Sequence, residues 1–421
     1  LVEPRRPGVE YYVAHRDTML FIITNDEAPN FRIMATPLKF PGREYWREFI
    51  PHDENVFIQD IDCFKRFLVV HESVDGVKRM KIKDFYTGEE YYVGFDEPVY
   101  TYYFGPNYMF DTTTVRFGYE SLITPYSVYD FDTQTRNRTL LKRREVLGGY
   151  EPGDYRCERL WATAPDGVNV PLSLVCRTDL YSADGTNPLV LEGYGAYGDF
   201  GEPYFSSIRV SLLDRGFVYA IAHVRGGREL GENWYEQGKL MHKKNTFTDF
   251  IACAEHLVAR NYTSAERMVF TGGSAGGLLM GAVLNMRPDL CGAVVADVPF
   301  VDVLDTMLDP SLGATVTEYE EWGDPSDPAA FEYIRSYCPY QNVKAQKYPP
   351  ILITAGFYDP RVNYWEPVKW AARLRERMTG GGPVLLKTTM AGHGGASGRY
   401  DFYREIAFDY AFILWRLGMH T

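Results

Sequence analysis

A serine flanked by glycines stands where a short apolar run ends. Ser274 lies in the segment 272–277, GGSAGG, which follows the apolar run 268–271 and precedes a second apolar stretch, 278–284. A G-x-S-x-G pattern between a strand and a helix predicts a nucleophile elbow, a strained turn that projects the serine hydroxyl into a cleft. The N–H of Ala275, at the start of the expected helix, would then stabilise an oxyanion. The alternative is a glycine-rich turn with an incidental serine.

Two further residues stand where the partners of a serine nucleophile belong. Asp359 follows the apolar run 351–355, and His393 lies in a Gly-His-Gly-Gly motif after the apolar run 384–388. The order Ser, Asp, His along the chain is that of α/β-hydrolases. We expect Ser274 to attack a carbonyl carbon, His393 to take up and return the proton, and Asp359 to orient the imidazole. An aspartate that only opens a turn is the alternative for Asp359, whereas a histidine between glycines is poorly suited to core packing.

A second oxyanion donor is expected in the segment 192–198, EGYGAYG, which follows the apolar run 189–191. Glycines and tyrosines at a strand end can form a loop that donates hydrogen bonds to a developing negative charge. The spacing alone does not distinguish Tyr194 from Tyr197. A turn with packed aromatic side chains is the alternative.

These residues need a scaffold that brings strand ends together, and residues 151–421 have the pattern of one. After a hairpin over 158–175, apolar runs alternate with helical patterns, as in a doubly wound, mostly parallel sheet. The expected strands are 188–191, 218–222, 268–271, 293–296, 351–355 and 384–388, and the expected helices include 247–258 and 368–378. Such sheets bind ligands at the carboxyl ends of their strands. We therefore predict an α/β-hydrolase catalytic domain here.

Residues 1–150 have a different pattern, in which apolar and polar residues alternate around polar turns. Hairpins are expected over 19–36, 67–83 and 115–131. They recur about every 48 residues, a period typical of propeller blades, with an irregular all-β domain as the alternative. Three blades are too few for a ring of about 4–8, so a partial β-propeller is predicted, with further blades upstream of Leu1.

Composition and charge exclude several classes of function. The net charge is −12 and there is no basic cluster, which argues against nucleic acid as a partner. No apolar run approaches about 18 residues, so no membrane association is expected, and without a signal peptide the expected location is cytoplasmic. Six scattered cysteines without a CxxC pair favour reduced thiols over disulfides or a metal site. No metal or organic cofactor is expected, since no ligand cluster or phosphate loop is present.

Several motifs together resemble the prolyl oligopeptidase family of serine peptidases, and in particular its oligopeptidase B branch. They are the Ser274 elbow and the segments 193–198 (GYGAYG), 224–231 (VRGGRELG), 318–323 (EYEEWG), 364–367 (YWEP) and 392–395 (GHGG). The 318–323 motif separates this branch from its prolyl-cleaving relatives. The resemblance implies a propeller that caps an α/β-hydrolase domain, with the active site in the cavity between them and access limited to peptides.

Carried over residue by residue, the resemblance assigns a reaction centre. Ser274, Asp359 and His393 match the family triad. Tyr194 matches the family tyrosine that donates to the oxyanion, with the N–H of Ala275 as the other donor.

The resemblance also assigns residues that bind substrate. Glu318 and Glu320 match a pair of acids that receives a basic side chain at P1, and Arg361 resembles an arginine that binds substrate carbonyls. Glu202 occupies the place of one P2 acid, but Tyr204 stands at the other, which leaves a basic P2 preference open. Two carboxylates two residues apart, in an extended stretch or held by a turn, can converge on one guanidinium. A solvated acidic loop is the alternative.

The leading hypothesis is a serine oligopeptidase that cleaves short basic peptides after Arg or Lys through an acyl-enzyme. The rivals are a prolyl or acylaminoacyl peptidase, a lipase or esterase, and a catalytically inert fragment that only binds. The chain lacks an initiator Met and the N-terminal segment of the family. We therefore expect an N-terminally truncated piece of a longer protein that is marginally stable alone, which a cooperative, reversible unfolding transition would contradict. The oligomeric state stays open.

Overall fold

The computed structural model describes residues 1–419, which divide by their internal contacts into two compact units. The first unit contains residues 1–152 and two short segments from later in the sequence, 202–206 and 228–234. Hydrogen bonds tie these segments to the blades: Phe205 N–H donates to Glu120 Oε2 at 3.0 Å, and the Ser73 hydroxyl donates to the Glu229 carbonyl at 2.8 Å. The second unit contains the rest of the chain.

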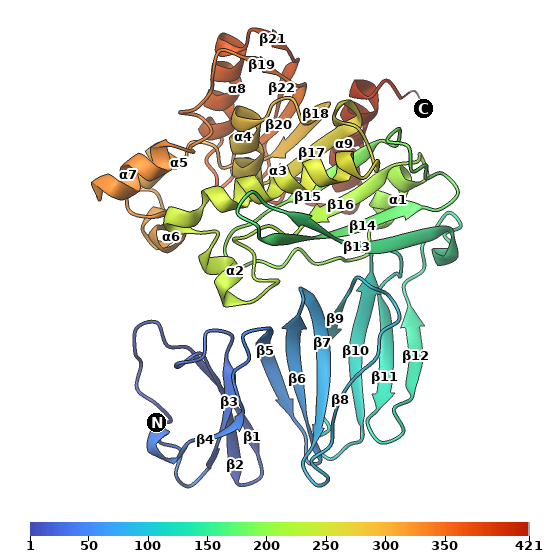
Figure 1. Ribbon diagram of the computed structural model, residues 1–421, viewed down its shortest axis with the longest axis vertical. Helices are drawn as coiled ribbons and strands as arrows, with labels where there is room; N and C mark the ends of the chain where they lie inside the picture. The colour runs from blue at the N-terminus through green and yellow to red at the C-terminus, as the bar shows by residue number, and fades with distance from the viewer. Residues whose placement is uncertain (420–421) are drawn as a thin grey trace. The chain divides into compact units, whose positions relative to one another are not determined.

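The first unit is built from three four-stranded antiparallel sheets, each a meander of consecutive strands (Figure 1). The first sheet contains β1 (Tyr11–Arg16), β2 (Met19–Thr24), β3 (Arg32–Pro37) and β4 (Arg47–Ile50). The second contains β5 (Val56–Cys63), β6 (Phe67–Val74), β7 (Val77–Asp84) and β8 (Glu90–Tyr92). The third contains β9 (Tyr100–Phe104), β10 (Thr114–Ser121), β11 (Ser127–Asp132) and β12 (Arg138–Arg143). Each expected hairpin lies in one sheet, and the predicted part of a propeller is confirmed.

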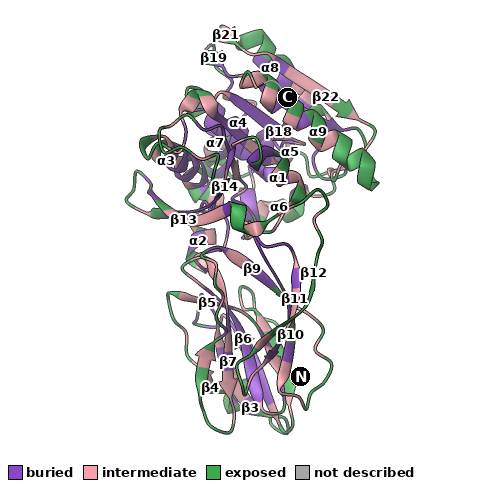
Figure 2. Ribbon diagram, turned by 90° about the vertical axis from the view of Figure 1, so that its right-hand side faces the viewer, coloured by how far each residue is buried: buried purple, intermediate pink, exposed green. Residues whose placement is uncertain are grey.

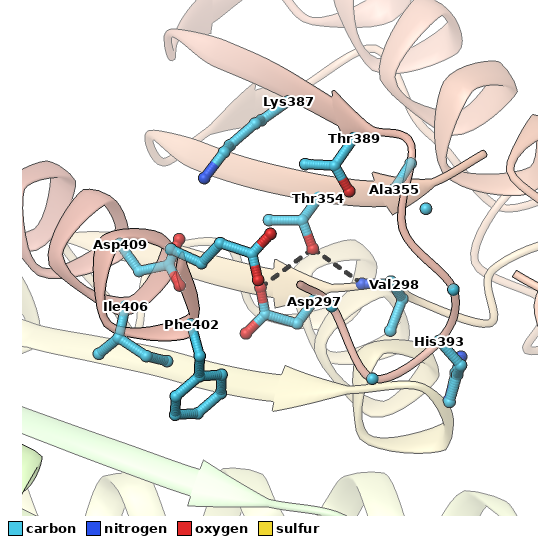
Figure 3. A pocket seen from close by; sticks show the side chains of 15 residues that line it. Asp297, Val298, Thr354, Ala355, Lys387, Thr389, His393, Phe402, Ile406 and Asp409 are labelled. Carbon is cyan, nitrogen blue, oxygen red and sulfur yellow. Dashed lines mark hydrogen bonds between the residues drawn. The ribbon is translucent and has the colours of Figure 1, made fainter. Parts of the chain in front are cut away.

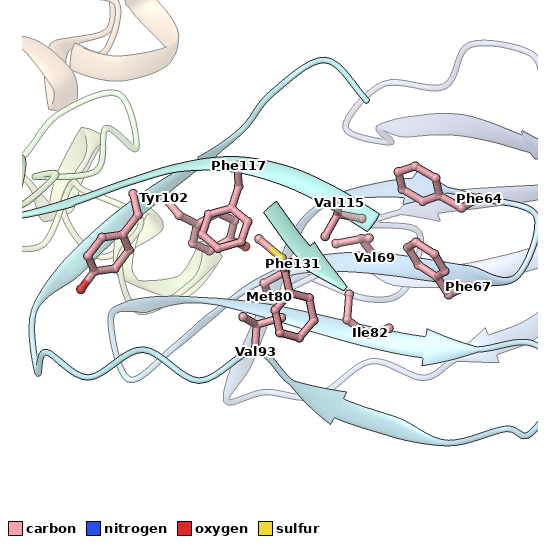
Figure 4. Close-up of a cluster of buried hydrophobic side chains, with 11 residues drawn as sticks. Phe64, Phe67, Val69, Met80, Ile82, Val93, Tyr102, Val115, Phe117 and Phe131 are labelled. Carbon is pink, nitrogen blue, oxygen red and sulfur yellow. The ribbon is translucent and has the colours of Figure 1, made fainter. Parts of the chain in front are cut away.

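Aromatic and aliphatic side chains of the second and third sheets form one core (Figure 4). Alternate residues of a strand face the same side, so Phe67 and Val69 of β6 meet Val115 and Phe117 of β10. The buried cluster contains Phe64, Phe67, Val69, Met80, Ile82, Val93, Tyr102, Val115, Phe117, Tyr119 and Phe131. Burying a side chain such as Phe117 contributes roughly 1.5–3 kcal/mol relative to leaving it exposed, so this cluster holds the two sheets together.

The second unit is built around an eight-stranded sheet in the order β13-β14-β16-β15-β17-β18-β20-β22. Its strands are parallel from β16 to β22, while β14 pairs antiparallel with both β13 and β16. The bounds are β13 Tyr155–Thr163, β14 Asn169–Arg177, β15 Leu189–Gly193, β16 Val218–Ala222, β17 Met268–Gly273, β18 Ala293–Asp297, β20 Ile351–Gly356 and β22 Val384–Thr389. A separate two-residue pair joins β19 (Lys347–Tyr348) to β21 (Gly380–Gly381). This is the mostly parallel α/β-hydrolase sheet that the sequence predicted.

Helices cover both faces of the large sheet. The α-helices of residues 1–419 are α1 Ser207–Leu213, α2 Glu232–Glu236, α3 Lys244–Ala259, α4 Ala275–Met286, α5 Val303–Met307, α6 Thr315–Trp322, α7 Pro328–Arg335, α8 Trp365–Arg377 and α9 Arg399–Arg416, of which α2 has most of its residues in the first unit. Val269 of β17 packs in one core with Leu212 of α1 and Phe412 of α9, whereas the next residue, Phe270, meets Phe250 of α3 on the opposite face. Figure 2 shows β18 and α4 as buried elements of this unit.

Two findings concern the whole of residues 1–419. None of the helices there combines the length and the apolar character that a bilayer crossing requires. All six cysteines are free thiols, of which Cys63 and Cys157 are half-buried and Cys176, Cys253, Cys291 and Cys338 are buried. The buried thiols therefore serve as small apolar side chains of the core.

Candidate active site

Ser274 lies on a sharp turn between strand β17 and helix α4. Its φ and ψ are 55° and −119°, a conformation that a non-glycine residue keeps only when its surroundings hold it. Two hydrogen bonds do so: Ser274 N–H donates to the Asp297 carbonyl at 2.9 Å, and Phe300 N–H donates to the Ser274 carbonyl at 3.0 Å. The turn thus has the geometry of a nucleophile elbow at the carboxyl end of the sheet.

Glycines let helix α4 begin close to the end of strand β15. A Cβ on Gly276 would lie 2.6 Å from the Gly193 carbonyl oxygen and 3.3 Å from the Tyr194 ring. A side chain there would therefore push two backbone segments apart. The close approach places Tyr194 beside the start of α4, where the N–H of Ala275 has no acceptor within the helix.

The carboxylate of Asp359 is shielded from solvent and holds His393 in one orientation. Its Oδ1 accepts the N–H of Arg361 at 2.9 Å and of Val362 at 3.0 Å. Its Oδ2 accepts a hydrogen bond from His393 Nδ1 at 2.7 Å. Because the carboxylate keeps the proton on Nδ1, Nε2 of His393 is left as the proton acceptor. Asp359 follows β20 and His393 follows β22, two neighbouring strands of the sheet.

Ser274 and His393 line two different cavities. The first cavity, of about 410 Å³, is lined by Ser274 together with Glu318. The second, of about 200 Å³, is lined by His393 together with Asp297 (Figure 3). Across residues 1–419 no hydrogen bond joins Ser274 to His393. The Asp–His hydrogen bond of the expected triad is therefore formed, and among residues 1–419 the Ser–His hydrogen bond is not.

Carboxyl groups line the second cavity, and one of them holds the loop that carries His393 (Figure 3). Glu405 of α9 accepts the Ala396 N–H at 2.9 Å, which anchors this loop to the helix. Burial raises the pKa of Asp409 to about 8, and the neighbouring charge of Asp297 adds to the rise. Burial also raises the pKa of Asp297, whose Oδ1 accepts the Thr354 hydroxyl at 3.1 Å. Asp297 and Asp409 therefore keep their protons more readily than carboxyl groups on an open surface would.

The two candidate tyrosines have different partners. Burial raises the pKa of Tyr194 to about 12, Asp199 adds to this rise, and a hydrogen bond with the Ser274 hydroxyl opposes it. The Tyr194 phenol is therefore a protonated donor near the serine. The Tyr197 hydroxyl instead donates to Glu318 Oε2 at 2.7 Å. The structure therefore distinguishes Tyr194 from Tyr197 by their hydrogen-bond partners, which the spacing in the sequence alone could not do.

The glutamates of the 318–323 motif lie on helix α6, not on an extended or turn-held segment, so that expectation is wrong. Side chains two residues apart on a helix point in different directions, and Glu318 and Glu320 cannot converge on one guanidinium. Glu318 lines the Ser274 cavity, whereas Glu320 is exposed. Glu318 Oε2 accepts the Tyr197 hydroxyl and also the Trp322 indole N–H at 2.9 Å. Glu321, three residues after Glu318, is buried on the same side of the helix.

Arg361 and Glu202, the other predicted binding residues, lie in different units. Arg361 has an exposed side chain and lines the Ser274 cavity. Glu202 belongs to the first unit, where its carboxylate forms an ion pair with Lys78. Its charge is therefore already balanced by a neighbour.

Two family models match the sequence behind this geometry. Residues 203–420 match the prolyl oligopeptidase family, and residues 1–144 match the prolyl oligopeptidase N-terminal β-propeller domain. The chain belongs to the prolyl oligopeptidase family.

Relatives within the prolyl oligopeptidase family align with the whole chain. Dipeptidyl aminopeptidase BI of Pseudoxanthomonas mexicana and Protease 2 of Moraxella lacunata are each 43% identical over 100% of this chain. Solved structures of oligopeptidase B from Leishmania major and Trypanosoma brucei have a TM-score of 0.93, with 42% and 44% identity over 99% and 100% of the chain. The chain spans 58% and 60% of the two curated relatives and 60% and 61% of the two solved chains.

Two buried charged residues, Lys243 and Glu321, were given no role from the sequence, although Glu321 lies within the 318–323 motif. Lys243 precedes α3 and carries no motif of its own. Glu321 would have been found by helical spacing, since a helix over α6 puts it on the same side as Glu318. Among the residues described, no group of His, Cys, Asp and Glu side chains is placed to hold a metal ion.

Proposed function

We propose that this chain carries the reaction centre of a serine oligopeptidase that hydrolyses short peptides after Arg or Lys. One observation carries the proposal: Ser274 and the carboxylate of Glu318 line the same cavity, of about 410 Å³. A nucleophilic hydroxyl and an acidic wall in one cavity suit a peptide bond that follows a cationic side chain. The similar solved structures named oligopeptidase B support the same proposed function.

In the proposed mechanism Ser274 Oγ attacks the scissile carbonyl carbon while Nε2 of His393 takes the hydroxyl proton. The N–H of Ala275 and the phenol of Tyr194 stabilise the oxyanion that forms. His393 then gives the proton to the leaving amine as the C–N bond breaks, and water hydrolyses the resulting ester with His393 again acting as base. These steps require His393 to come within hydrogen-bond distance of Ser274, while Asp359 keeps the imidazole oriented.

Glu318 is the proposed acceptor of the basic P1 side chain. Its Oε2 is held by two neutral donors, and Oε1 has no hydrogen-bond partner in the described part of the chain. The carboxylate is therefore oriented without being neutralised, which lowers the cost of binding a cation. Arg361, in the wall of the same cavity, is proposed to contact substrate carbonyl groups. The exposed Glu320 and the paired Glu202 are given no role in this proposal.

The test is hydrolysis of matched fluorogenic peptide amides with Arg, Lys, Pro or Ala at P1, beside labelling with a fluorophosphonate. We expect cleavage after Arg and Lys and a single labelled residue, Ser274. Cleavage only after Pro or Ala would contradict the assignment of Glu318. Ser274→Ala should keep the unfolding midpoint and lose the label and about 10⁶-fold of kcat, the order seen when a triad nucleophile is removed. Residual activity near the wild-type level would place the nucleophile elsewhere.

A second candidate, release of N-terminal dipeptides, is favoured by the name of one relative, dipeptidyl aminopeptidase BI. The same experiment separates the two functions if each Arg substrate is made with a free and with a blocked N-terminus. An oligopeptidase acts on both forms, whereas a dipeptidyl aminopeptidase requires the free amine.

A further inference from the structure

A buried lysine contacts the loop after β15 and helix α6, which both contribute residues to the Ser274 cavity. Lys243 is 1% exposed, and its ammonium donates to the Gly195 carbonyl at 2.5 Å. The ammonium also lies 3.8 Å from Glu321 Oε1 and 4.8 Å from the centroid of the Trp322 indole. Burial lowers the pKa of Lys243 to about 8 despite the attraction of Glu321. A buried charge pair of this kind is usually less stabilising than apolar residues of the same size.

Glu321 continues the same network from helix α6. One carboxylate oxygen accepts the Tyr197 N–H at 3.1 Å, and the other accepts the Tyr235 hydroxyl at 2.7 Å. The ion pair therefore holds the loop that follows β15 at two points, through the Gly195 carbonyl and the Tyr197 amide. Tyr194, the proposed oxyanion donor, is the residue directly before the first of these points.

The pair also sets the position of Glu318. The indole that faces the Lys243 ammonium donates its N–H to Glu318 at 2.9 Å, and the Tyr197 hydroxyl donates to the same oxygen at 2.7 Å. The ion pair therefore holds both donors in place. The Lys243 ammonium contacts the Trp322 indole, and the Glu321 carboxylate accepts the Tyr197 N–H. Within residues 1–419, the Lys243 side chain contacts the loop after β15 and helix α6. Both elements contribute residues to the Ser274 cavity.

We propose that Lys243 and Glu321 are positioning residues that hold the oxyanion donor Tyr194 and the P1 acceptor Glu318 in register with each other. The inference rests on the proposed function, because it assigns roles through Tyr194 and Glu318. A displacement of about 1 Å in either group can cost of the order of 100-fold in rate, so one buried pair governs both turnover and selectivity.

The test compares Lys243→Met, Glu321→Gln and the double variant with Lys244→Met, which removes an exposed lysine at the next position. Three quantities are measured: the ratio of kcat/KM for Arg over Ala at P1, the rate of fluorophosphonate labelling, and the unfolding midpoint. We expect each single variant to lower the Arg/Ala ratio and the labelling rate by about 10- to 100-fold, while Lys244→Met stays near wild type.

The double variant separates positioning from mere stability. It leaves no unpaired buried charge, so its unfolding midpoint should recover toward wild type, while the Arg/Ala ratio and the labelling rate stay low. Recovery of all three together, or unchanged ratios in the single variants, would overturn the proposal.

Two further measurements keep the test decisive. If the buried variants do not fold, Tyr235→Phe removes one hydrogen bond from Glu321, and we expect a smaller fall in the same ratio; an unchanged ratio would count against the proposal. If wild type shows no preference for Arg, the proposed function fails, but the labelling rate still reports the loop that carries Tyr194 and so tests the pair independently.

Discussion

Glu318 is oriented before any substrate binds. Tyr197 and Trp322 donate to the same carboxylate oxygen, so the side chain is fixed while its charge stays unbalanced by any cation in residues 1–419. A free carboxylate on a flexible side chain would lose rotamer freedom on binding a guanidinium, and this one has lost it already. Selectivity for a basic residue is therefore expected to depend on Glu318 and on the two donors that hold it.

Glu318→Gln should reduce the selectivity for Arg over Ala by about 2–5 kcal/mol, because the guanidinium would then be buried without a counter-charge. Glu320→Gln is the matched control, since it makes the same chemical change two residues away on the exposed side of α6. We expect the control to change selectivity by less than about 0.5 kcal/mol. The measurement is kcat/KM on paired Arg and Ala substrates. Equal losses in the two variants would show that both glutamates contact the substrate.

The two tyrosines of the 192–198 segment should differ in what they lose. Tyr194→Phe removes a proposed oxyanion donor, so kcat should fall by about 10²- to 10³-fold on Arg and Ala substrates alike. Tyr197→Phe removes a donor to Glu318, so it should lower the Arg/Ala ratio and leave kcat on the Ala substrate nearly unchanged. Steady-state kinetics on both substrates distinguish the two patterns. The reverse pattern would exchange their roles.

Among the elements, α8 is joined to α5 by one buried carboxyl group, and α5 is joined to α6 by a separate hydrogen bond. Glu366 of α8 accepts the Asp302 N–H at 3.0 Å and the Thr306 hydroxyl at 2.8 Å. Thr306 of α5 in turn accepts the Thr315 hydroxyl of α6 at 2.9 Å. Thr306 and Thr315 line the Ser274 cavity. Glu366, whose carboxyl group changes charge near neutral pH, therefore supports the helices that carry these two cavity-lining residues.

The stability of this brace should depend on pH. Burial raises the pKa of Glu366 from 4.5 to about 8. The folded protein therefore keeps a proton that the unfolded chain releases, so the stability from this group is complete below pH 4.5 and is lost as pH rises through about 8. We expect the unfolding midpoint to fall between pH 5 and 8 and this slope to be shallower in Glu366→Gln. Glu376→Gln, an exposed change on the same helix, should keep the full slope.

The strands of the large sheet could be predicted from the sequence because each buried strand corresponds to a short run of apolar residues. The run 218–222 is strand β16 (Val218–Ala222), and the runs before Ser274 and Asp359 are β17 and β20 to within two residues. Parallel strands are buried on both faces, so such runs are nearly continuous. Since the sheet order brings their carboxyl ends together, the positions of Ser274, Asp359 and His393 at one edge followed from the same pattern.

Two features of the site could not be predicted because they depend on distant contacts. Helix α6 contains Thr, Val and Tyr, which favour strands, and it is stabilised by burying Thr315, Glu321 and Trp322 against the rest of the unit. The loop that carries His393 is anchored to α9 by the hydrogen bond from the Ala396 N–H to Glu405. Neither contact produces a periodic pattern in the amino-acid sequence by which it could have been predicted.

At the scale of the whole molecule, the net charge of −12 should attract cationic peptides. Between about 0.01 and 0.15 M salt the screening length falls from about 30 to about 8 Å. We therefore expect kcat/KM for an Arg peptide to decrease severalfold over this range, and kcat/KM for an uncharged Ala peptide to stay constant. A decrease of the same size for both peptides would point to an effect of salt on the protein itself.

The segments 202–206 and 228–234 belong to the first unit although they are encoded between elements of the second. The polypeptide therefore passes between the two units more than once, and no single cut separates them. A gene fragment that began after residue 152 would encode Phe205 and Glu229 without their partners Glu120 and Ser73. The large sheet therefore cannot be transferred to another protein as an independent unit. Attaching a different set of blades to it would require redesign of both inserted segments and of the junction.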